Sequence, residues 1–246
     1  MDLDVHQLTL VGDREVNQDF MAYIVDDAYA LFVMADGLGG HLAGNKASRF
    51  FCEGMLRFAK AYSGLLARNP NPSTMISLWI TDAVNEMKQL FGQDSDVEQA
   101  CTTCAILYID KWFVLTAHCG DTRIYRMNPQ QILWRTQDHS VVQELIDQGE
   151  IAEQEMAQHP CQNQLTRCIN ALRAHEAEIR LYPAMEKGET FVLCSDGFWG
   201  KVKQHELLQL AQLDSGEAEL SKLVQLAMLR GNGKSDNVTA QLIRCL

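Results

Sequence analysis

Residues 31–37 read LFVMADG, so that five apolar residues end abruptly in an aspartate, Asp36, followed by a glycine. Residues 191–197, FVLCSDG, end in the same way at Asp196. Each apolar run predicts a buried strand with a carboxylate at its end. Burying an ionised carboxylate beside a core is costly unless the group is paired or binds a metal ion. Two such strand ends therefore predict a shared site.

Three more aspartates stand at comparable positions. Asp236 follows a turn-rich loop and enters the last apolar run, while Asp19 and Asp121 lie at the edges of other expected strands. Together with Asp36 and Asp196 they could form one cluster of oxygen ligands, which selects hard ions such as Mg²⁺ or Mn²⁺. The alternative for any single Asp-Gly pair is a plain turn, because the glycine lets the backbone turn sharply.

Alternating and β-branched patterns predict strands, and helical spacing of apolar residues predicts a smaller set of helices. The expected strands are 5–11, 20–25, 29–35, 102–109, 112–117, 123–127, 132–135, 179–182, 190–194 and 237–244. The expected helices are 47–58, 73–91 with a serine cap, 141–148, 205–213 and 218–230. Strands that arrive in runs with short connections favour antiparallel sheets covered by helices, the α+β class.

The composition predicts a chain that folds throughout. Of 246 residues, 47% are apolar and 22% charged, and this length suits a single domain over residues 1–246. The first residues carry acid where a secretion signal carries base, and no stretch reaches the ~18–20 apolar residues of a membrane span. We therefore expect a cytoplasmic protein with reduced cysteines and no membrane contact. The net charge of −11 argues against a nucleic-acid partner.

Read in order, these residues resemble the PPM/PP2C family of metal-dependent protein serine/threonine phosphatases, especially its compact bacterial members. The resemblance runs nearly end to end. It rests on GDREVNQD (12–19), ADGLGGH (35–41), TT (102–103), GDTR (120–123), DHS (138–140), HP (159–160), LTR (165–167), SDG (195–197) and SDNVT (235–239). The resemblance implies a four-layer αββα sandwich, in which two antiparallel sheets pack face to face with helices on both outer faces.

The resemblance also implies ligands for a dinuclear site. Asp36 would bridge two ions, and the carbonyl of Gly37 would bind one of them. Asp196 and Asp236 would complete the other. Asp121 would hold a third, weaker ion together with Asp196.

Two further roles follow from the same resemblance: Asp19 would act through metal-bound water, and Arg14 would hold the substrate phosphate with its planar fork. Two divalent ions ~3.5–4 Å apart can activate a bridging hydroxide for direct attack on phosphorus, without a phosphoenzyme. The implied function is Mn²⁺- or Mg²⁺-dependent hydrolysis of phosphoserine and phosphothreonine in proteins. The implied setting is a bacterial signalling system with a serine/threonine kinase as partner.

The chain departs from the family pattern at several positions. Cys101 and Asn170 stand where glycines are usual, and Asn45 stands where an acidic residue is common. Some relatives have a histidine directly after the first Asp-Gly as general acid, but this chain has Leu38 there. The general acid is therefore open between two other histidines, His41 and His159, each of which could instead be structural.

Several other classes of protein share parts of this sequence pattern. A nucleotide-binding loop around Lys234 would need a glycine where Met228 stands, and a dinucleotide fingerprint would need a glycine in place of Leu42. A single CxxC pair at 101–104 has redox or zinc spacing but no second pair. A pseudophosphatase that only binds phosphoproteins, or a phosphatase of small phosphate esters, would carry much of the same pattern.

A cysteine-based phosphatase is the alternative that a single substitution tests. His118-Cys119 resembles its signature, but that signature requires an arginine after five intervening residues, and Tyr125 stands at that position. We expect Cys119→Ser to keep metal-dependent hydrolysis of p-nitrophenyl phosphate, because a water molecule and not a thiol attacks phosphorus. Loss of turnover in a folded Cys119→Ser protein would place the chain in the other class.

Overall fold

The computed structural model describes residues 2–38 and 41–246, and its strands form two sheets. The first sheet has the order β1-β12-β11-β7-β8. Its strands are β1 (Leu3–Leu10), β12 (Val238–Cys245), β11 (Thr190–Cys194), β7 (Arg123–Met127) and β8 (Ile132–Arg135). The first and last strands of the chain, β1 and β12, pair along their whole length.

The second sheet is built around the long strand β3 (Tyr29–Leu38), which lies between its neighbours β2 and β5. On one side β2 (Asp19–Val25) pairs with it, and on the other side follow β5 (Cys104–Asp110), β6 (Phe113–Cys119) and β10 (Glu178–Pro183). Two short strands, β4 (Cys101–Thr102) and β9 (Ile169–Asn170), extend this sheet beyond the end of β5. All pairings of these named strands are antiparallel.

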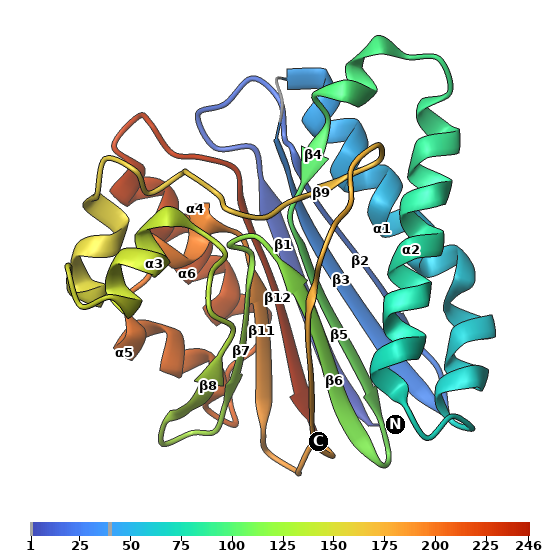
Figure 1. The fold of residues 1–246 in the computed structure, drawn as a ribbon. Helices are drawn as coiled ribbons and strands as arrows, with labels where there is room; N and C mark the ends of the chain where they lie inside the picture. Colours follow the sequence, from blue (N-terminus) through green and yellow to red (C-terminus); the bar gives the residue numbers. More distant parts are fainter. Residues whose placement is uncertain (1, 39–40) are drawn as a thin grey trace.

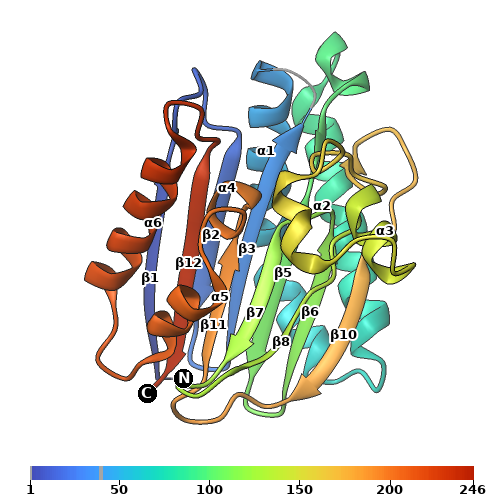
Figure 2. The ribbon, with the colours of Figure 1, turned by 90° about the vertical axis from the view of Figure 1, so that its left-hand side faces the viewer.

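Helices cover both outer faces of the two packed sheets (Figure 1). The helices α1 (His41–Leu66) and α2 (Pro72–Phe91) lie over the second sheet. The first sheet is covered by α4 (Asp196–Trp199), α5 (Gln204–Leu207) and α6 (Glu217–Gly231). In Figure 2 the layers lie one behind another, with α5 and α6 toward the viewer and α3 (Val141–Asp147) on the side of the molecule that carries β10. Short 3-10 helices span Ser95–Glu98, Glu153–Gln158 and Leu208–Ala211.

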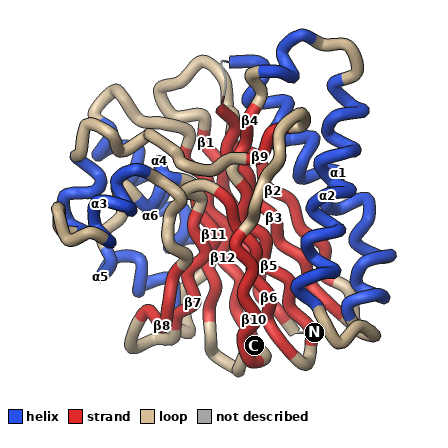
Figure 3. Tube along the Cα trace, in the orientation of Figure 1, coloured by secondary structure: helices blue, strands red, loops and turns tan. Residues whose placement is uncertain are grey.

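Three apolar layers hold these elements together, as expected for a four-layer sandwich. In β3, Leu31 and Val33 point toward the helices, and Phe32 and Met34 point between the sheets. Successive side chains of a strand alternate between its faces, so a strand buried on both faces is apolar throughout. This explains the uninterrupted run at 31–35, and the predicted α+β sandwich is confirmed (Figure 3).

The structure corrects three expected elements. The strand expected at 102–109 is interrupted at Thr103, where the backbone N–H of Asp36 donates to the side-chain Oγ1 of Thr103. The expected serine cap is wrong, because Asn71 accepts the hydrogen bond from the backbone of Thr74 and Pro72 occupies the first helical position. The helix expected at 205–213 is two short pieces that end at Ala211.

The early end of that helix has a visible cause. Arg244 of β12 donates to the carbonyls of Leu210, Leu213 and Ser215, at 2.9, 3.3 and 2.6 Å. These carbonyls are therefore bound by a side chain in place of a further helical turn. In the described part of the chain, no helix is long and apolar enough to cross a membrane.

Candidate metal centre

The structure places Asp19 and Asp36 opposite each other in the pairing of β2 with β3. Asp36 does not end its strand as expected, because β3 continues to Leu38 by pairing with β4. Burial raises the pKa of Asp19 to about 6. Burial, and then the negative charge of Asp19, raise the pKa of Asp36 well above its ordinary value. Two like charges at paired positions repel, so this pair needs a cation or a proton.

Asp196 and Asp236 reach the same place from the first sheet. Asp196 follows β11 and begins α4, while Asp236 precedes β12, the neighbour of β11. Both line one cavity of about 160 Å³, together with Arg14. Burial, and then the charges of Asp121 and Asp236, raise the pKa of Asp196 well above its usual range. The four aspartates thus lie where the ends of the two sheets meet.

Asp121 joins this group from the connection between β6 and β7, where the chain passes from one sheet to the other. Burial, and then the charge of Asp138, raise the pKa of Asp121 to about 7. The indole N–H of Trp199 donates to the carbonyl of Asp121 at 2.9 Å. Because Trp199 and Asp196 share α4, this bond ties Asp121 to the element that carries Asp196.

A pair of threonines holds the backbone of Asp36. The carbonyl of Asp36 accepts hydrogen bonds from the N–H of Thr103 at 2.8 Å and from the hydroxyl of Thr102 at 3.0 Å. Its N–H donates to Oγ1 of Thr103 at 2.9 Å. The Thr-Thr block is part of the family resemblance, but its role is visible only in the structure. The hydroxyls of both threonines add side-chain hydrogen bonds to the backbone of Asp36 where the strand is interrupted.

The glycines that follow two of the aspartates serve close packing, and not the sharp turn expected from sequence. A Cβ on Gly37 would lie 2.0 Å from the carbonyl oxygen of Gly44 in α1, and one on Gly197 would lie 2.1 Å from that of Asn237. Neither glycine has a positive φ. Gly39 and Gly40 of the sequence motif lie outside the described residues, as does the side chain of His41.

The loop at 11–18 is fastened to the segment before β12. Oδ2 of Asp13 accepts from the N–H and the hydroxyl of Ser235, at 2.7 and 2.8 Å. Asn237 accepts from the N–H of Gln18 and donates to the carbonyl of Val11, at 2.8 and 2.7 Å. These contacts were not predicted, although Asp13 and Asn237 stand inside the sequence blocks GDREVNQD and SDNVT that carry the resemblance.

This fastening brings Arg14 to the cavity. Its Nη2 lies 2.8 Å from Oδ2 of Asp236, and the side chain is half-exposed. Gln162, Asn163, Lys201 and Lys234 also line the cavity. His159, one candidate general acid, does not line it, and its Nδ1 accepts from the N–H of Cys161.

The donor set fits divalent metal ions. Oδ2 of Asp19 accepts from the hydroxyl of Ser195 at 2.7 Å, but its Oδ1 is buried without a hydrogen-bond partner among the described residues. An orphaned carboxylate oxygen, surrounded by carboxylates that raise one another's pKa, is the environment that a hard cation relieves.

Among the described residues, the one group of three possible ligands whose ligand atoms all lie within 4.8 Å of one another contains none of these aspartates and consists of His118, His139 and Glu178. The two imidazole rings stack, with centroids 4.6 Å apart and planes inclined by 6°. Ring nitrogens ligate in the ring plane, so nearly parallel rings do not converge on one ion. Nδ1 of His139 already accepts from the N–H of Gly120, whose carbonyl accepts from the N–H of His139. This group therefore holds Gly120, the neighbour of Asp121.

Comparisons with known proteins show which family and fold this chain resembles. A family model described as protein phosphatase 2C matches residues 11–242. The protein phosphatase PhpP of Streptococcus pneumoniae is 28% identical over 98% of this chain and 97% of its own length. The serine/threonine phosphatase of S. agalactiae superposes with a TM-score of 0.79 at 28% identity and covers 100% of both chains.

A catalytic domain of the phosphatase PstP, solved with two manganese ions, has the same fold. Its TM-score is 0.79 at 22% identity, over 98% of this chain and 97% of that one.

The raised pKa of Asp121 predicts how metal-free protein responds to pH. A folded-state pKa above the unfolded value favours the folded protein at low pH, and this contribution is lost as pH rises through about 7. In chelator, we expect the melting temperature of Asp121→Asn, relative to that of the unsubstituted protein, to rise by about 4–8 °C between roughly pH 5.5 and 8. Thermal unfolding followed by circular dichroism measures the difference, in which the histidine contributions cancel. A difference independent of pH would contradict the buried charge.

Proposed function

Because the chain belongs to the protein phosphatase 2C family, whose model spans residues 11–242, we propose that it hydrolyses phosphoserine and phosphothreonine in proteins by a metal-dependent mechanism. The observation that carries the proposal is the gathering of Asp19, Asp36, Asp121 and Asp196 at one end of two sheets, each with a raised pKa. The chain is an enzyme of the phosphatase class, and the proposal concerns its ligands and substrates.

We assign the ions as follows. Asp36 and the carbonyl of Gly37, with Asp196 and Asp236, would hold two Mn²⁺ or Mg²⁺ ions, and Asp121 with Asp196 a weaker third. When bound, such ions neutralise phosphate oxygens and make water a stronger nucleophile at neutral pH. Support comes from the convergence of these side chains from both sheets and from the oxygen-only donor set.

The remaining work falls to side chains around the ions. Asp19, held through Oδ2 by Ser195, keeps its Oδ1 available to orient the attacking water. Arg14 lies at the mouth of the cavity, where its guanidinium can turn from Asp236 to a substrate phosphate and donate two parallel hydrogen bonds. Water attacks phosphorus directly, so no phosphorylated side chain forms.

The wider proposals rest on the family and the fold. We take residues 1–246 as one domain, because β1 and β12 from the two ends of the sequence pair in one sheet. The partners would be phosphorylated proteins and the serine/threonine kinase that modifies them, in the cytoplasm. A pseudophosphatase is disfavoured, since every aspartate of the proposed site is present and gathered.

The proposed function is tested by phosphate release from phosphoserine, phosphothreonine and phosphotyrosine peptides. We expect release from the first two to require Mn²⁺ or Mg²⁺ and to stop with chelator until metal is restored. Asp196→Asn should lower kcat by more than about 100-fold, because removing even a group that only hydrogen-bonds to a metal ligand costs roughly 10–100-fold. Asp214→Asn, at an exposed aspartate, is the matched control and should retain full activity. Undiminished release after removal of all metal would refute the proposal.

Arg14 carries a separate prediction. Arg14→Ala should raise KM for a phosphopeptide by about 10-fold with a smaller effect on kcat, because a charge-assisted hydrogen bond of ~1.5 kcal/mol in both ground and transition state is lost. Arg14→Lys should not restore KM, since an ammonium lacks the planar fork. Arg49→Ala, at an exposed arginine of α1, serves as control. An unchanged KM in Arg14→Ala would assign the phosphate to another residue.

A further inference from the structure

A groove of about 720 Å³ opens directly beside the aspartate cavity. It lies between the strands β7 and β8, the 3-10 helix at Glu153–Gln158 and the connection from α4 to α5. The groove and the cavity share Gly200 and Lys201 as lining residues. A volume of this size is typical of ligand pockets, which range over about 300–1,000 Å³. Any chain that extends from a phosphate in the cavity can therefore continue into the groove.

The charges of the groove are not balanced. Arg135 pairs with Glu153, and Arg230 pairs with Glu206. Lys201 and Lys203 are exposed, and no ion pair involving either occurs among the described residues. The groove thus presents two uncompensated positive charges on a chain whose net charge is −11.

The backbone that carries these lysines is held in place. Nη1 of Arg230 donates to the carbonyl of Lys201 at 2.7 Å. The same guanidinium binds both carboxylate oxygens of Glu206, and Oε2 of Glu206 accepts from the N–H of Lys203 at 2.8 Å. The ion pair between Arg230 and Glu206 therefore fixes both ends of the segment from Lys201 to Lys203. A fixed segment loses less conformational entropy when it binds a partner.

Apolar residues complete the groove. Ile132 and Val202 are half-buried and pack against the core beneath, with Leu207 beside them. A surface that combines an apolar wall with two lysines on a held backbone segment suits an extended peptide that has acidic side chains. A nucleic acid would instead require a broad basic face, which two lysines do not supply.

We propose that this groove binds the residues next to the phosphorylated side chain of a protein substrate, and that Lys201 and Lys203 select substrates that are acidic at those positions. The proposal rests on the proposed function, since it names the protein substrates of that same site. It adds a preference that the aspartates alone do not provide, because the metal ions that they would hold act only on the phosphate.

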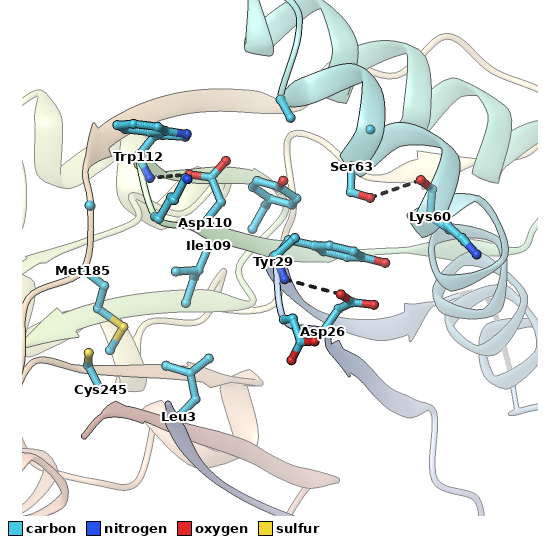
Figure 4. A pocket seen from close by; sticks show the side chains of 17 residues that line it. Leu3, Asp26, Tyr29, Lys60, Ser63, Ile109, Asp110, Trp112, Met185 and Cys245 are labelled. Carbon is cyan, nitrogen blue, oxygen red and sulfur yellow. Dashed lines mark hydrogen bonds between the residues drawn. The ribbon is translucent and has the colours of Figure 1, made fainter. Parts of the chain in front are cut away.

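A second large cavity, of about 660 Å³, lies at the other end of the sandwich, near the start of β3 (Figure 4). Its lining includes Lys60 and Lys111 together with Asp26, Asp27 and Asp110. Acidic and basic groups are nearly balanced there, so nothing in its charge identifies an occupant. Lys60 and Lys111 are exposed and lie at the other end of the sandwich from the proposed metal site, which makes them a matched control.

The test compares phosphothreonine peptides that differ only in three flanking residues, either acidic or alanine, placed before or after the phosphothreonine. With Mn²⁺ present, we expect one acidic peptide to exceed its alanine counterpart about three- to tenfold in kcat/KM, mainly through KM. Salt at about 0.5 M should shrink the ratio, because it screens exposed charges. The ratio is the readout, so a general loss of activity cancels.

Three double variants complete the experiment. Lys201→Glu/Lys203→Glu should abolish or reverse the acidic preference, and Lys201→Ala/Lys203→Ala should abolish it. Lys60→Glu/Lys111→Glu changes the net charge equally and should keep the preference. A ratio of one in the unsubstituted protein, or an unchanged ratio in the Lys201/Lys203 variants, overturns the groove proposal. Failure to hydrolyse any phosphopeptide would instead overturn the proposed function.

Discussion

Repulsion between buried carboxylates is the constraint on which the rest of this structure depends. Asp19 and Asp36 occupy opposite positions of one strand pair, and Asp121, Asp196 and Asp236 approach them from other elements. A protein that only had to fold would place such residues in solvent, where each charge is hydrated. The arrangement is stable with counter-ions present, so the stability of this end of the sandwich is linked to the metal that it binds.

Neutral hydrogen bonds hold the backbones of Asp36 and Asp121 in position, whereas Asp236 forms an ion pair with Arg14. The threonines at 102 and 103 fix the backbone of Asp36, and Trp199 fixes that of Asp121. Arg123 lies over the Trp199 ring, 3.5 Å from its centroid, and is itself bound through both terminal oxygens of Asp138. The charge of Arg123 is thereby balanced by Asp138, and among the described residues Asp19, Asp36, Asp121 and Asp196 have no ion pair, whereas Asp236 pairs with Arg14.

Positive charge around the cavity is arranged outward from the aspartates. Arg14 and Lys234 line the cavity itself, and Lys201 stands where the cavity meets the groove. A phosphorylated peptide carries negative charge at the phosphate and, in acidic sequences, beside it. In the two proposals, positive charge therefore attracts negative charge at both places: metal ions and Arg14 would bind the phosphate, and the lysines would bind the flanking chain.

The sequence by itself determined the fold class and most strands, because apolar patterns are local signals, and it indicated the aspartates that we propose as site residues. It also marked the Thr-Thr block and Arg14 through the resemblance. It did not determine that β3 passes beyond Asp36, that the glycines at 37 and 197 are required by close packing, or that Trp199 supports Asp121. Those features depend on which segments pair, and residues such as Asp19 and Ser195 meet across 176 positions only when the two sheets pack together.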